Sequence, residues 1–489
     1  MASKEKTALD LKYPADVAIV VAGSVDSGKS STIGVLVTGK LDDGNGSARE
    51  IVAKHPHEIS SGKTSDISTK TFKTHENKLV TLIDLCGHEK YLKTTTYGIT
   101  GYYPDYAIVV ISANRGVLKM TKEHLCILLY MNIPIIIVVT RADIAPTEIY
   151  MQTMQTIKII GKKFHRQIEQ INSMDDMSLP IDELKTAEMN SITKIETLAN
   201  IIHKNEDVIP VIVTSNKTGY YIEPFKYLIG SLKPRQLWPS SITNGSVFYI
   251  DSSFSPPGIG LVVSGVLRGN SVKNGDTLYL GPKGKDFYPV RVRSIHDNNK
   301  QISSELSNHQ RGCFAISSID KKVEITRKMI SKGIVLISDK EMMNNICYRF
   351  TADIEVLNHS TTISKNYSPV IHCGTIRQTA RLISINNIDR SNRKEKDASV
   401  EENTLRTGDI ANVTFKFKFY PEFLEPKKSK ESESELKTTL FFREGTTRGT
   451  GSIDNIIPMS EDIDPNPDPV QKRKRFFRRK KNNINIKVV

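Results

Sequence analysis

The stretch "GSVDSGKS", residues 23–30, follows the apolar run "VAIVVA" and opens a segment whose apolar residues have helical spacing. It fits the pattern G-x-x-x-x-G-K-[ST], in which the glycines let backbone N–H groups wrap the phosphates of a nucleotide. We expect Lys29 to contact the β- and γ-phosphates and the Ser30 hydroxyl to bind Mg²⁺. The alternative, a glycine-rich turn with a lysine there by chance, is rare between a strand and a helix. The expected phosphate-binding residues are Gly23, Ser24, Val25, Asp26, Ser27, Gly28, Lys29, Ser30 and Ser31.

Short runs of β-branched residues alternate with helical patterns from residue 17 to residue 214. The runs are "VAIVVAG", "LVTLID", "YAIVVIS", "PIIIVVT" and "VIPVIVT". Continuous apolar runs of this length are typical of parallel strands that are buried on both faces. Segments such as "TKEHLCILLYMN" and "TEIYMQTMQTIKIIGKK" lie between them and have helical spacing. The pattern predicts an α/β P-loop domain with a doubly wound, mostly parallel sheet.

The character of the chain changes after this domain. From Ser246 onward the apolar runs are short and are interrupted by Gly, Asn and Asp, which is typical of antiparallel β-barrels. A polar interruption over residues 386–405 predicts a long surface loop. The predicted organisation is an N-terminal extension over 1–15, the P-loop domain over 16–238, β-barrels over 239–345 and 346–457, and a disordered basic tail over 458–489.

Composition limits the class of protein. A length of 489 residues predicts two to four domains, and 38% hydrophobic with 25% charged residues is an ordinary globular balance. The apolar runs fall far short of the ~18 residues that a membrane helix needs, and no apolar signal core opens the chain. Five cysteines without a C-x-x-C pair argue against a disulfide framework or a zinc site. We therefore expect a cytoplasmic protein with no membrane span.

A second motif, "IDLCGHEKY", closes the strand run that begins at residue 79. A carboxylate at a strand end with a glycine three residues later suits a Mg²⁺ shell beside a γ-phosphate sensor. We expect Asp84 to hold the metal through water and the N–H of Gly87 to meet the terminal phosphate. A D-x-x-G sequence alone is usually a turn, and its place about 55 residues after the phosphate loop strengthens the prediction.

The base is expected to bind at "TRAD", residues 140–143. Guanine presents N1–H and an N2 amine on one edge, and the carboxylate of Asp143 can accept hydrogen bonds from both. Adenine has no amine there, and charge-assisted hydrogen bonds are each worth about 1.5–3 kcal/mol. The alternative is that Asp143 only caps the helix that follows. In "VTSNKTG", backbone N–H groups of Ser215, Asn216 and Lys217 could meet the guanine oxygen.

Four motifs in this order and spacing resemble the GTPase module of translation factors. "GSVDSGKS" is similar to the phosphate loop of elongation factor Tu, and "PGIGLVVSGVLRGNSVKNGDTL" resembles the second-domain barrel of that family. "FFREGTTRGTGSI" resembles the last strands of the third domain. "GHEKYLKTT", "MTKEHL" and "HCGTIRQTARL" look like the branch called GTP-binding protein one, which is related to elongation factor one-alpha.

The resemblance implies roles for four further residues. His88 stands where the family keeps the histidine that orients the attacking water. Thr64, in "SGKTSDI", matches the switch threonine that completes the Mg²⁺ shell with Ser30 and Asp84. Thr140 and Arg141 stand where elongation factors have Asn and Lys. Thr140 should weaken the brace that the Asn provides to the phosphate loop, whereas Arg141 can stack on the base through its planar guanidinium.

Other departures affect the switch segments. Lys63 replaces an apolar gate over the catalytic water, although Val25 on the other side of the gate is kept. Cys86 replaces a proline and is expected to be a small buried hydrophobe. No motif in the sequence supplies an arginine finger, and GTPases without one hydrolyse slowly until a partner acts.

These features predict a monomeric GTPase of the elongation-factor type that binds GTP, GDP and Mg²⁺. By resemblance, its partners are the ribosome and aminoacyl-tRNA. Two alternatives stay open: a ribosome-rescue or mRNA-surveillance GTPase of the same fold, and a GTP-dependent binding scaffold with little hydrolysis.

The net charge of +14 is uneven along the chain, because "KRKRFFRRKK", residues 472–481, holds eight basic side chains. This tail could contact RNA, act as a nuclear-import address or remain a solvated segment.

Overall fold

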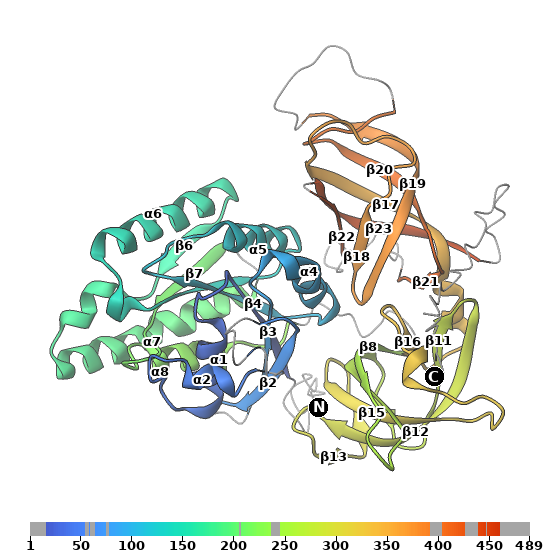
Figure 1. Ribbon diagram of the computed structural model, residues 1–489, viewed down its shortest axis with the longest axis horizontal. Coiled ribbons are helices and arrows are strands. Elements are labelled where there is room, and N and C mark those ends of the chain that lie inside the picture. The colour runs from blue at the N-terminus through green and yellow to red at the C-terminus, as the bar shows by residue number, and fades with distance from the viewer. Residues whose placement is uncertain are drawn as a thin grey trace, which may run out of the picture.

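The computed structural model describes residues 16–53, 58, 64–74, 78–204, 207–235, 245–391, 403–425, 439–445 and 447–459. These residues form an α/β unit, at the left in Figure 1, and two β-barrels at the right, the first below the second. The N-terminal extension, Lys63 and the basic tail lie outside the described residues, so the predictions made for them stay predictions.

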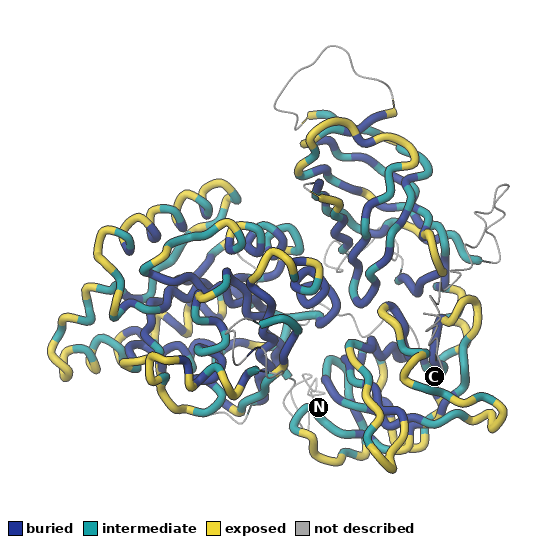
Figure 2. The backbone as a smooth tube through the Cα atoms, in the orientation of Figure 1, coloured by how far each residue is buried: buried dark blue, intermediate teal, exposed yellow. Residues whose placement is uncertain are grey.

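The α/β unit is built on one sheet with the strand order β2-β3-β1-β4-β5-β7-β6. Neighbouring strands are parallel except for the pair β2 and β3. Every residue of β1, β3, β4 and β5 is buried, because helices cover both faces (Figure 2). The structure therefore confirms the predicted P-loop fold. The strands are β1 (Val17–Ala22), β2 (Ser68–Lys73), β3 (Leu79–Asp84), β4 (Tyr106–Ser112), β5 (Ile135–Thr140), β6 (Gln167–Gln170) and β7 (Val208–Val213).

Helices follow the strands of the α/β unit, and the turns between strands and helices carry the residues of the site. The α-helices are α1 (Lys29–Thr38), α2 (Ser47–Glu50), α4 (Leu92–Gly101), α5 (Lys119–Tyr130), α6 (Thr147–Lys163), α7 (Ile181–His203) and α8 (Ile222–Ser231). The 3₁₀ turns of this unit are η1 (Glu89–Tyr91), η2 (Ala142–Ile144) and η3 (Met174–Ser178). Helix α1 starts after Gly28, whose left-handed backbone, with φ of 92°, few other residues adopt.

The first barrel is antiparallel and closes through the pairing of β11 with β12. Its core includes the rings of Phe248 and Phe314, whose centroids are 4.3 Å apart. The strands are β8 (Ser246–Phe254), β9 (Leu261–Gly269), β10 (Val272–Lys273), β11 (Thr277–Lys283), β12 (Asp286–Asp297), β13 (Ile302–Ser303), β14 (Glu305–Leu306), β15 (Arg311–Ser318) and β16 (Val335–Ile337), with the 3₁₀ turns η4 (Arg327–Met329) and η5 (Glu341–Asn345).

The second barrel closes in the same way, through the pairing of β17 with β20. Alternate residues of β20 are buried, as expected for a strand with one face toward a core. Strand β19 continues to Asp389, so the first residues of the predicted 386–405 loop are strand instead, and 392–402 lie outside the described residues. The strands are β17 (Ile346–Asn358), β18 (Val370–Cys373), β19 (Ile376–Asp389), β20 (Ile410–Phe417), β21 (Glu422–Phe423), β22 (Thr439–Glu444) and β23 (Thr447–Pro458).

Candidate nucleotide site

A cavity lies between β1 and α1, where the phosphate-loop sequence turns from strand to helix. Lys29, at the start of α1, is buried, and its ammonium group donates to the carbonyl of Ser24 at 2.7 Å. This bond holds the lysine side chain against the backbone of the phosphate loop. All the lining residues except Arg49 were predicted from the sequence. The cavity is lined by Val25, Asp26, Gly28, Lys29, Ser30, Ser31, Arg49, Thr64, Gly87 and Arg141.

The three predicted metal ligands come together beside this cavity. The hydroxyl of Ser30 donates to Oδ2 of Asp84 at 2.7 Å, and the hydroxyl of Thr64 donates to the same oxygen at 3.3 Å. The two hydroxyl oxygens are 3.3 Å apart. The other carboxylate oxygen, Oδ1 of Asp84, is buried without a hydrogen-bond partner among the described residues. Oxygen ligands of this kind suit Mg²⁺, so the residues present fit the ion.

Burial shifts the ionisation of both charged groups in this cluster. It raises the pKa of the Asp84 carboxyl and lowers the pKa of the Lys29 ammonium, and the attraction between the two groups opposes both shifts. A bound polyphosphate would supply negative charge to Lys29, and a divalent cation would supply positive charge to Asp84. Burying these two charged groups therefore costs free energy when the site is empty, and a metal-bound nucleotide would offset that cost.

Gly87, the last residue of the D-x-x-G motif, lies against the phosphate loop. A Cβ atom at Gly87 would be 2.7 Å from Nζ of Lys29 and 2.7 Å from the backbone nitrogen of Val25. Such distances are too short for any side chain, so only glycine lets the backbone come this close. Gly87 therefore lies beside the phosphate loop, and the contact of its N–H with a terminal phosphate stays a prediction.

The "TRAD" segment begins at the end of β5. Thr140 donates to the carbonyl of Ser27 at 2.7 Å, so the threonine still braces the phosphate loop. Arg141 has a left-handed backbone with φ of 60° and lines the phosphate cavity. Asp143 lies in the 3₁₀ turn η2, whereas α6 is capped at Pro146 without any side-chain hydrogen bond. Asp143 therefore does not cap α6, and its role in base recognition stays a prediction.

The "VTSNKTG" loop after β7 is ordered by its own serine. The buried hydroxyl of Ser215 accepts hydrogen bonds from the backbone N–H groups of Lys217 and Thr218, at 3.3 and 3.1 Å. The side-chain amide of Asn216 donates to the hydroxyl of Thr32 in α1 at 3.0 Å, and the backbone carbonyl of Asn216 accepts from the backbone N–H of Asp42 at 2.9 Å. The loop is thereby joined to α1 and to the segment that follows α1.

Comparison with known proteins identifies the family. Residues 16–235 match the family described as the elongation factor Tu GTP binding domain, and residues 349–429 match the GTP-eEF1A C-terminal domain-like family. The chain is 33% identical to GTP-binding protein 1 of Xenopus laevis over 484 residues and 31% identical to GTP-binding protein 2 of Mus musculus over 472 residues. The matches take in 94% and 90% of the chain.

The chain belongs to the elongation-factor family of translation GTPases. It spans 66% of the length of the Xenopus relative and 69% of the mouse relative. The fold resembles that of translation elongation factor SelB from Methanococcus maripaludis in complex with the GTP analogue GppNHp, with a TM-score of 0.60 and 22% identity. That match covers 92% of the chain and 80% of SelB.

His88, the predicted catalytic residue of this GTPase, lies at the edge of the site. It is exposed, and its Nδ1 accepts a hydrogen bond from the backbone N–H of Lys90 at 3.1 Å. It does not line the phosphate cavity, although its neighbour Gly87 does. Its role in orienting water stays a prediction, and it requires the side chain to turn from this position.

Two residues of α5 support the phosphate loop and were not predicted. Nδ1 of the buried His124 accepts a hydrogen bond from the backbone N–H of Gly23 at 3.1 Å. The hydroxyl of Thr121 lies 2.8 Å from the hydroxyl of Ser24. Both residues belong to "MTKEHL", about 100 positions from the loop. Spacing along the sequence gave no signal of this contact, because it depends on how α5 packs.

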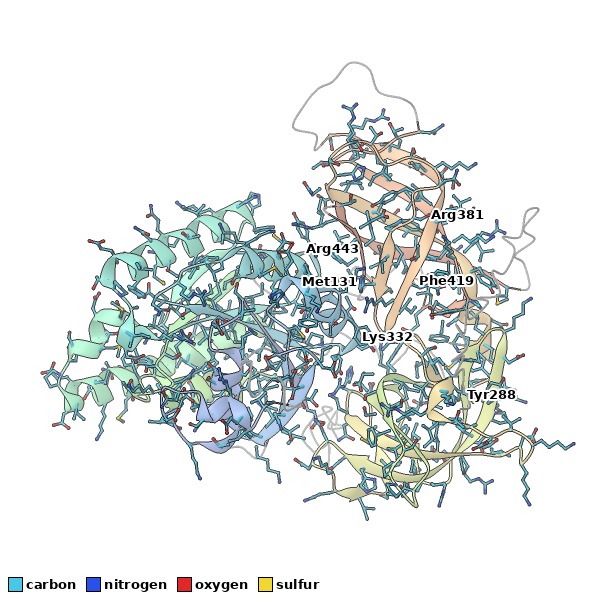
Figure 3. All side chains as sticks on the ribbon, viewed as in Figure 1. Met131, Tyr288, Lys332, Arg381, Phe419 and Arg443 are labelled. Carbon is cyan, nitrogen blue, oxygen red and sulfur yellow. The ribbon has the colours of Figure 1, made fainter. Side chains whose placement is uncertain are left out.

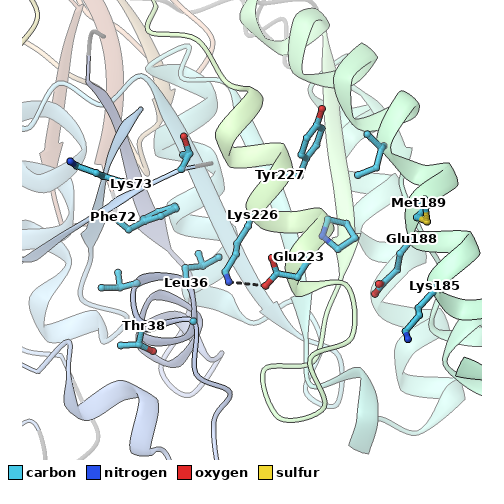
Figure 4. A pocket seen from close by; sticks show the side chains of 15 residues that line it. Leu36, Thr38, Phe72, Lys73, Lys185, Glu188, Met189, Glu223, Lys226 and Tyr227 are labelled. Atoms are coloured by element: carbon cyan, nitrogen blue, oxygen red, sulfur yellow. Dashed lines mark hydrogen bonds and ion pairs between the residues drawn. The ribbon is translucent and has the colours of Figure 1, made fainter. Parts of the chain in front are cut away.

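A larger cavity of about 780 Å³ lies on another part of the α/β unit, between α1, β2, α7 and α8 (Figure 4). Apolar residues such as Leu36 and Phe72 line it together with charged ones, and Lys226 pairs with Glu223 at its wall at 2.7 Å. None of the predicted nucleotide-binding residues lines it. It is separate from the phosphate cavity.

Proposed function

We propose that this GTPase uses a GTP–GDP cycle, with Mg²⁺ held by Ser30, Thr64 and Asp84, to control how its two barrels present a surface for RNA on the ribosome. When bound, the ion would neutralise phosphate charge. The single observation that carries the proposal is the path of the chain from Gly87 to the barrels through α4.

The start of this path is tied to the switch. The hydroxyl of Thr95, in the first turn of α4, donates to the carbonyl of Cys86 at 2.7 Å. A movement of the backbone beside Gly87 is therefore transmitted to the helix. Cys86 is buried, and burial raises the pKa of its thiol to about 12, in keeping with a small hydrophobic side chain.

The end of the path contacts the first barrel directly. The guanidinium of Arg311 donates to the carbonyl of Tyr102 at 2.9 Å and lies 5.3 Å from the centre of its ring. Nζ of Lys332 lies 3.6 Å from the ring centre of Tyr97, and Figure 3 labels this lysine between the α/β unit and the barrels.

Tyr103 continues the contact into both barrels. Its ring centroid is 4.9 Å from that of Tyr249 in β8. A Cβ atom at Gly374, in the β18–β19 turn of the second barrel, would lie 2.0 Å from the Tyr103 hydroxyl. Tyr103 has a left-handed backbone with φ of 47° and is partly buried. A shift of α4 would therefore move Tyr103, which contacts both barrels.

We further propose that the GTP form binds aminoacyl-tRNA and delivers it to the ribosome in the cytoplasm. Membership of an elongation-factor family supports this partner class. Among the described residues, no helix is long and apolar enough to cross a membrane. The proposed domain boundaries remain 16–238, 239–345 and 346–457.

The proposal is tested by GTP hydrolysis with and without ribosomes, with Lys29→Ala as the control that removes nucleotide binding. We expect ribosomes to raise the rate of the native chain by at least 10-fold. Equal rates with and without ribosomes would favour the scaffold alternative instead.

A second assay identifies the RNA. The GTP-loaded and GDP-loaded forms are each used to capture aminoacyl-tRNA and deacylated tRNA. Selective capture of aminoacyl-tRNA by the GTP form supports delivery. Stimulation by ribosomes without such selectivity would favour the rescue or surveillance alternative.

A further inference from the structure

Arg49, in the short helix α2, lines the phosphate cavity together with Ser30 and Ser31. Most of the other lining residues belong to sequence motifs, whereas Arg49 lies in the segment between α1 and Thr64. It is half-buried, and its guanidinium has no hydrogen bond or ion pair with another described residue. A permanent positive charge therefore faces a site that takes a polyphosphate, without an acidic partner among the residues described.

Close packing fixes α2 against α1. A Cβ atom at Gly34 would lie 1.9 Å from the carbonyl oxygen of Ala48, so the two helices meet at a glycine that nothing larger can replace. Gly34 is one helical turn beyond Ser30 and Ser31, and Arg49 follows Ala48 directly. The contact thus places the arginine next to the turn of α1 that binds phosphate.

The loop before α2 is held from both sides. Asp42 accepts from the backbone N–H of Ala48 at 3.0 Å, while its own N–H donates to the carbonyl of Asn216 at 2.9 Å. Asp43 accepts from the N–H groups of Ser47, Asn45 and Gly46 at 3.2, 2.8 and 3.0 Å, and these bonds, that from Ser47 above all, lower the pKa of its carboxyl to about 2. The helix is therefore positioned by hydrogen bonds before any ligand binds.

Gly46 leaves space for the side chain of Arg49, because it has no Cβ atom. Its backbone is left-handed, with φ of 97°, and a Cβ atom there would be 2.9 Å from Nε of Arg49. A larger residue at this position would push the guanidinium away. The loop sequence thus both anchors the helix and leaves space for the charged group.

We propose that Arg49 is a catalytic residue that acts within the same chain, as an arginine finger that contacts the phosphates of GTP. In the reaction, the oxygen of a water molecule forms a bond to the γ-phosphorus while the bond to the β–γ bridging oxygen breaks. The electron pair of that bond stays on the β-phosphate of GDP, and the protons of the water remain with the released phosphate and solvent. Arg49 stabilises the negative charge that develops on the β-phosphate.

The inference rests on the proposed GTP cycle but does not depend on the ribosome or on RNA. Arginine is suited to this task because its planar fork donates two parallel hydrogen bonds to phosphate oxygens and stays charged. Arginine fingers supplied in trans or in cis raise hydrolysis rates by about 10³- to 10⁵-fold in other GTPases. The role predicts a hydrolysis rate without partners that depends on Arg49.

The test compares the native chain with Arg49→Ala, Arg49→Lys and the matched control Glu50→Ala, an exposed neighbour on the same helix that does not line the cavity. Three quantities are measured without ribosomes: the Kd values for GDP and GTP, the single-turnover rate of hydrolysis, and the capture of GDP by aluminium fluoride as a transition-state analogue. The midpoint of thermal unfolding checks that each variant is folded.

We expect both Arg49 variants to bind GDP within about 3-fold of the native chain, to hydrolyse GTP about 100-fold more slowly and to lose the aluminium fluoride complex. Glu50→Ala should match the native chain in all three. The proposal is wrong if Arg49→Ala weakens GDP and GTP binding equally while the single-turnover rate stays unchanged, because Arg49 would then only bind the ground state. It is equally wrong if the aluminium fluoride complex survives in a folded Arg49→Ala. A failure of ribosome stimulation alone would affect the function proposed above and leave this result standing.

Discussion

The backbone N–H of Gly23 donates to Nδ1 of His124 across 3.1 Å, which joins the first glycine of the phosphate loop to helix α5. For this bond the imidazole must accept at Nδ1, so the ring has to be neutral there. Burial, with a smaller contribution from the nearby cations Lys29 and Arg443, lowers the pKa of His124 to about 3. The contact is therefore maintained at neutral pH.

The first prediction concerns the pH dependence of stability. The unfolded chain binds a proton at His124 below pH ~6.5, whereas the folded chain does not until about pH 3. Stability from this group is complete above the unfolded value and is lost as the pH falls from about 6.5 toward 3. In His124→Asn, the side-chain oxygen can still accept from Gly23 but does not titrate.

The free energy of unfolding of the native chain and of this variant is measured with urea at pH 7.5, 6 and 5. We expect the advantage of the native chain to shrink by about 1.4 kcal/mol per pH unit below pH ~6. A difference that stays constant across these pH values would show that His124 is not held neutral.

The second prediction concerns the base. Asp143→Asn should change the preferred nucleotide from GTP to xanthosine triphosphate, because the Asn amine can donate to the xanthine oxygen and its carbonyl accepts only one hydrogen bond from guanine. Competition binding with the two nucleotides measures the change. Glu148→Gln, in the following helix α6, serves as the control. If Asp143→Asn binds GTP as tightly as the native chain does, Asp143 does not recognise the base.

The third prediction concerns His88, which is exposed and lies outside the lining of the phosphate cavity. His88→Ala should keep GTP affinity near that of the native chain, because the side chain is expected to contact water. Ribosome-stimulated turnover should fall by about 100-fold or more, which is the usual effect of losing a positioned acid–base group. Equal stimulated rates would mean that His88 never turns toward the substrate.

The fourth prediction concerns the contact between α5 and the second barrel. Nη2 of Arg448 in β23 lies 2.6 Å from Oε1 of Glu123, with only 24% and 13% of these side chains exposed. A double-mutant cycle on unfolding should give a coupling of about 1–3 kcal/mol. The exposed pair of Lys119 and Glu89, at 3.4 Å, is the internal control and should couple by less than about 1 kcal/mol.

A coupling for Glu123 and Arg448 no larger than that of the control would mean that this ion pair does not hold the barrel to α5. Stability is measured at low and high salt, because a partly buried pair should be less sensitive to screening than an exposed one.

The sequence was sufficient for the parts of this molecule that depend on local pattern. Buried β-branched runs predicted the strands of the α/β unit, because parallel strands with helices on both faces have no polar side. Ser30 and Asp84 meet as predicted, because the turn from β1 to α1 and the end of β3 lie at one edge of the sheet. Thr64 also reaches Asp84, because β2, which follows it, is antiparallel to β3 and starts beside the end of β3.

Helix α7 shows what the sequence left out. Its buried stripe includes Ile195, Leu198, Ala199 and Ile202, at helical spacing, within a segment that is otherwise strongly polar. The pattern was present but weak, since most of the helix faces solvent. Strand β6, just before it, is half-buried at the edge of the sheet and gives no clear alternation.

The support of the site by α5 and α2 could not be predicted. His124 contacts Gly23 because α5 packs beside the phosphate loop, and Arg49 lines the phosphate cavity because α2 packs against α1, where Gly34 meets Ala48. No motif encodes such an approach. For the same reason, the strength of the brace from Thr140 was judged from residue type, whereas the structure shows a short hydrogen bond of 2.7 Å to Ser27.

The two barrels are also tied to each other. Arg268 in β9 forms an ion pair at 2.9 Å with Glu425, and Tyr249 donates to the same carboxylate at 2.7 Å. Both charged side chains are largely buried. Separating the barrels would break this ion pair and leave at least one charge without its partner, which is strongly disfavoured. The two barrels should consequently move together as one rigid body when the bound nucleotide changes.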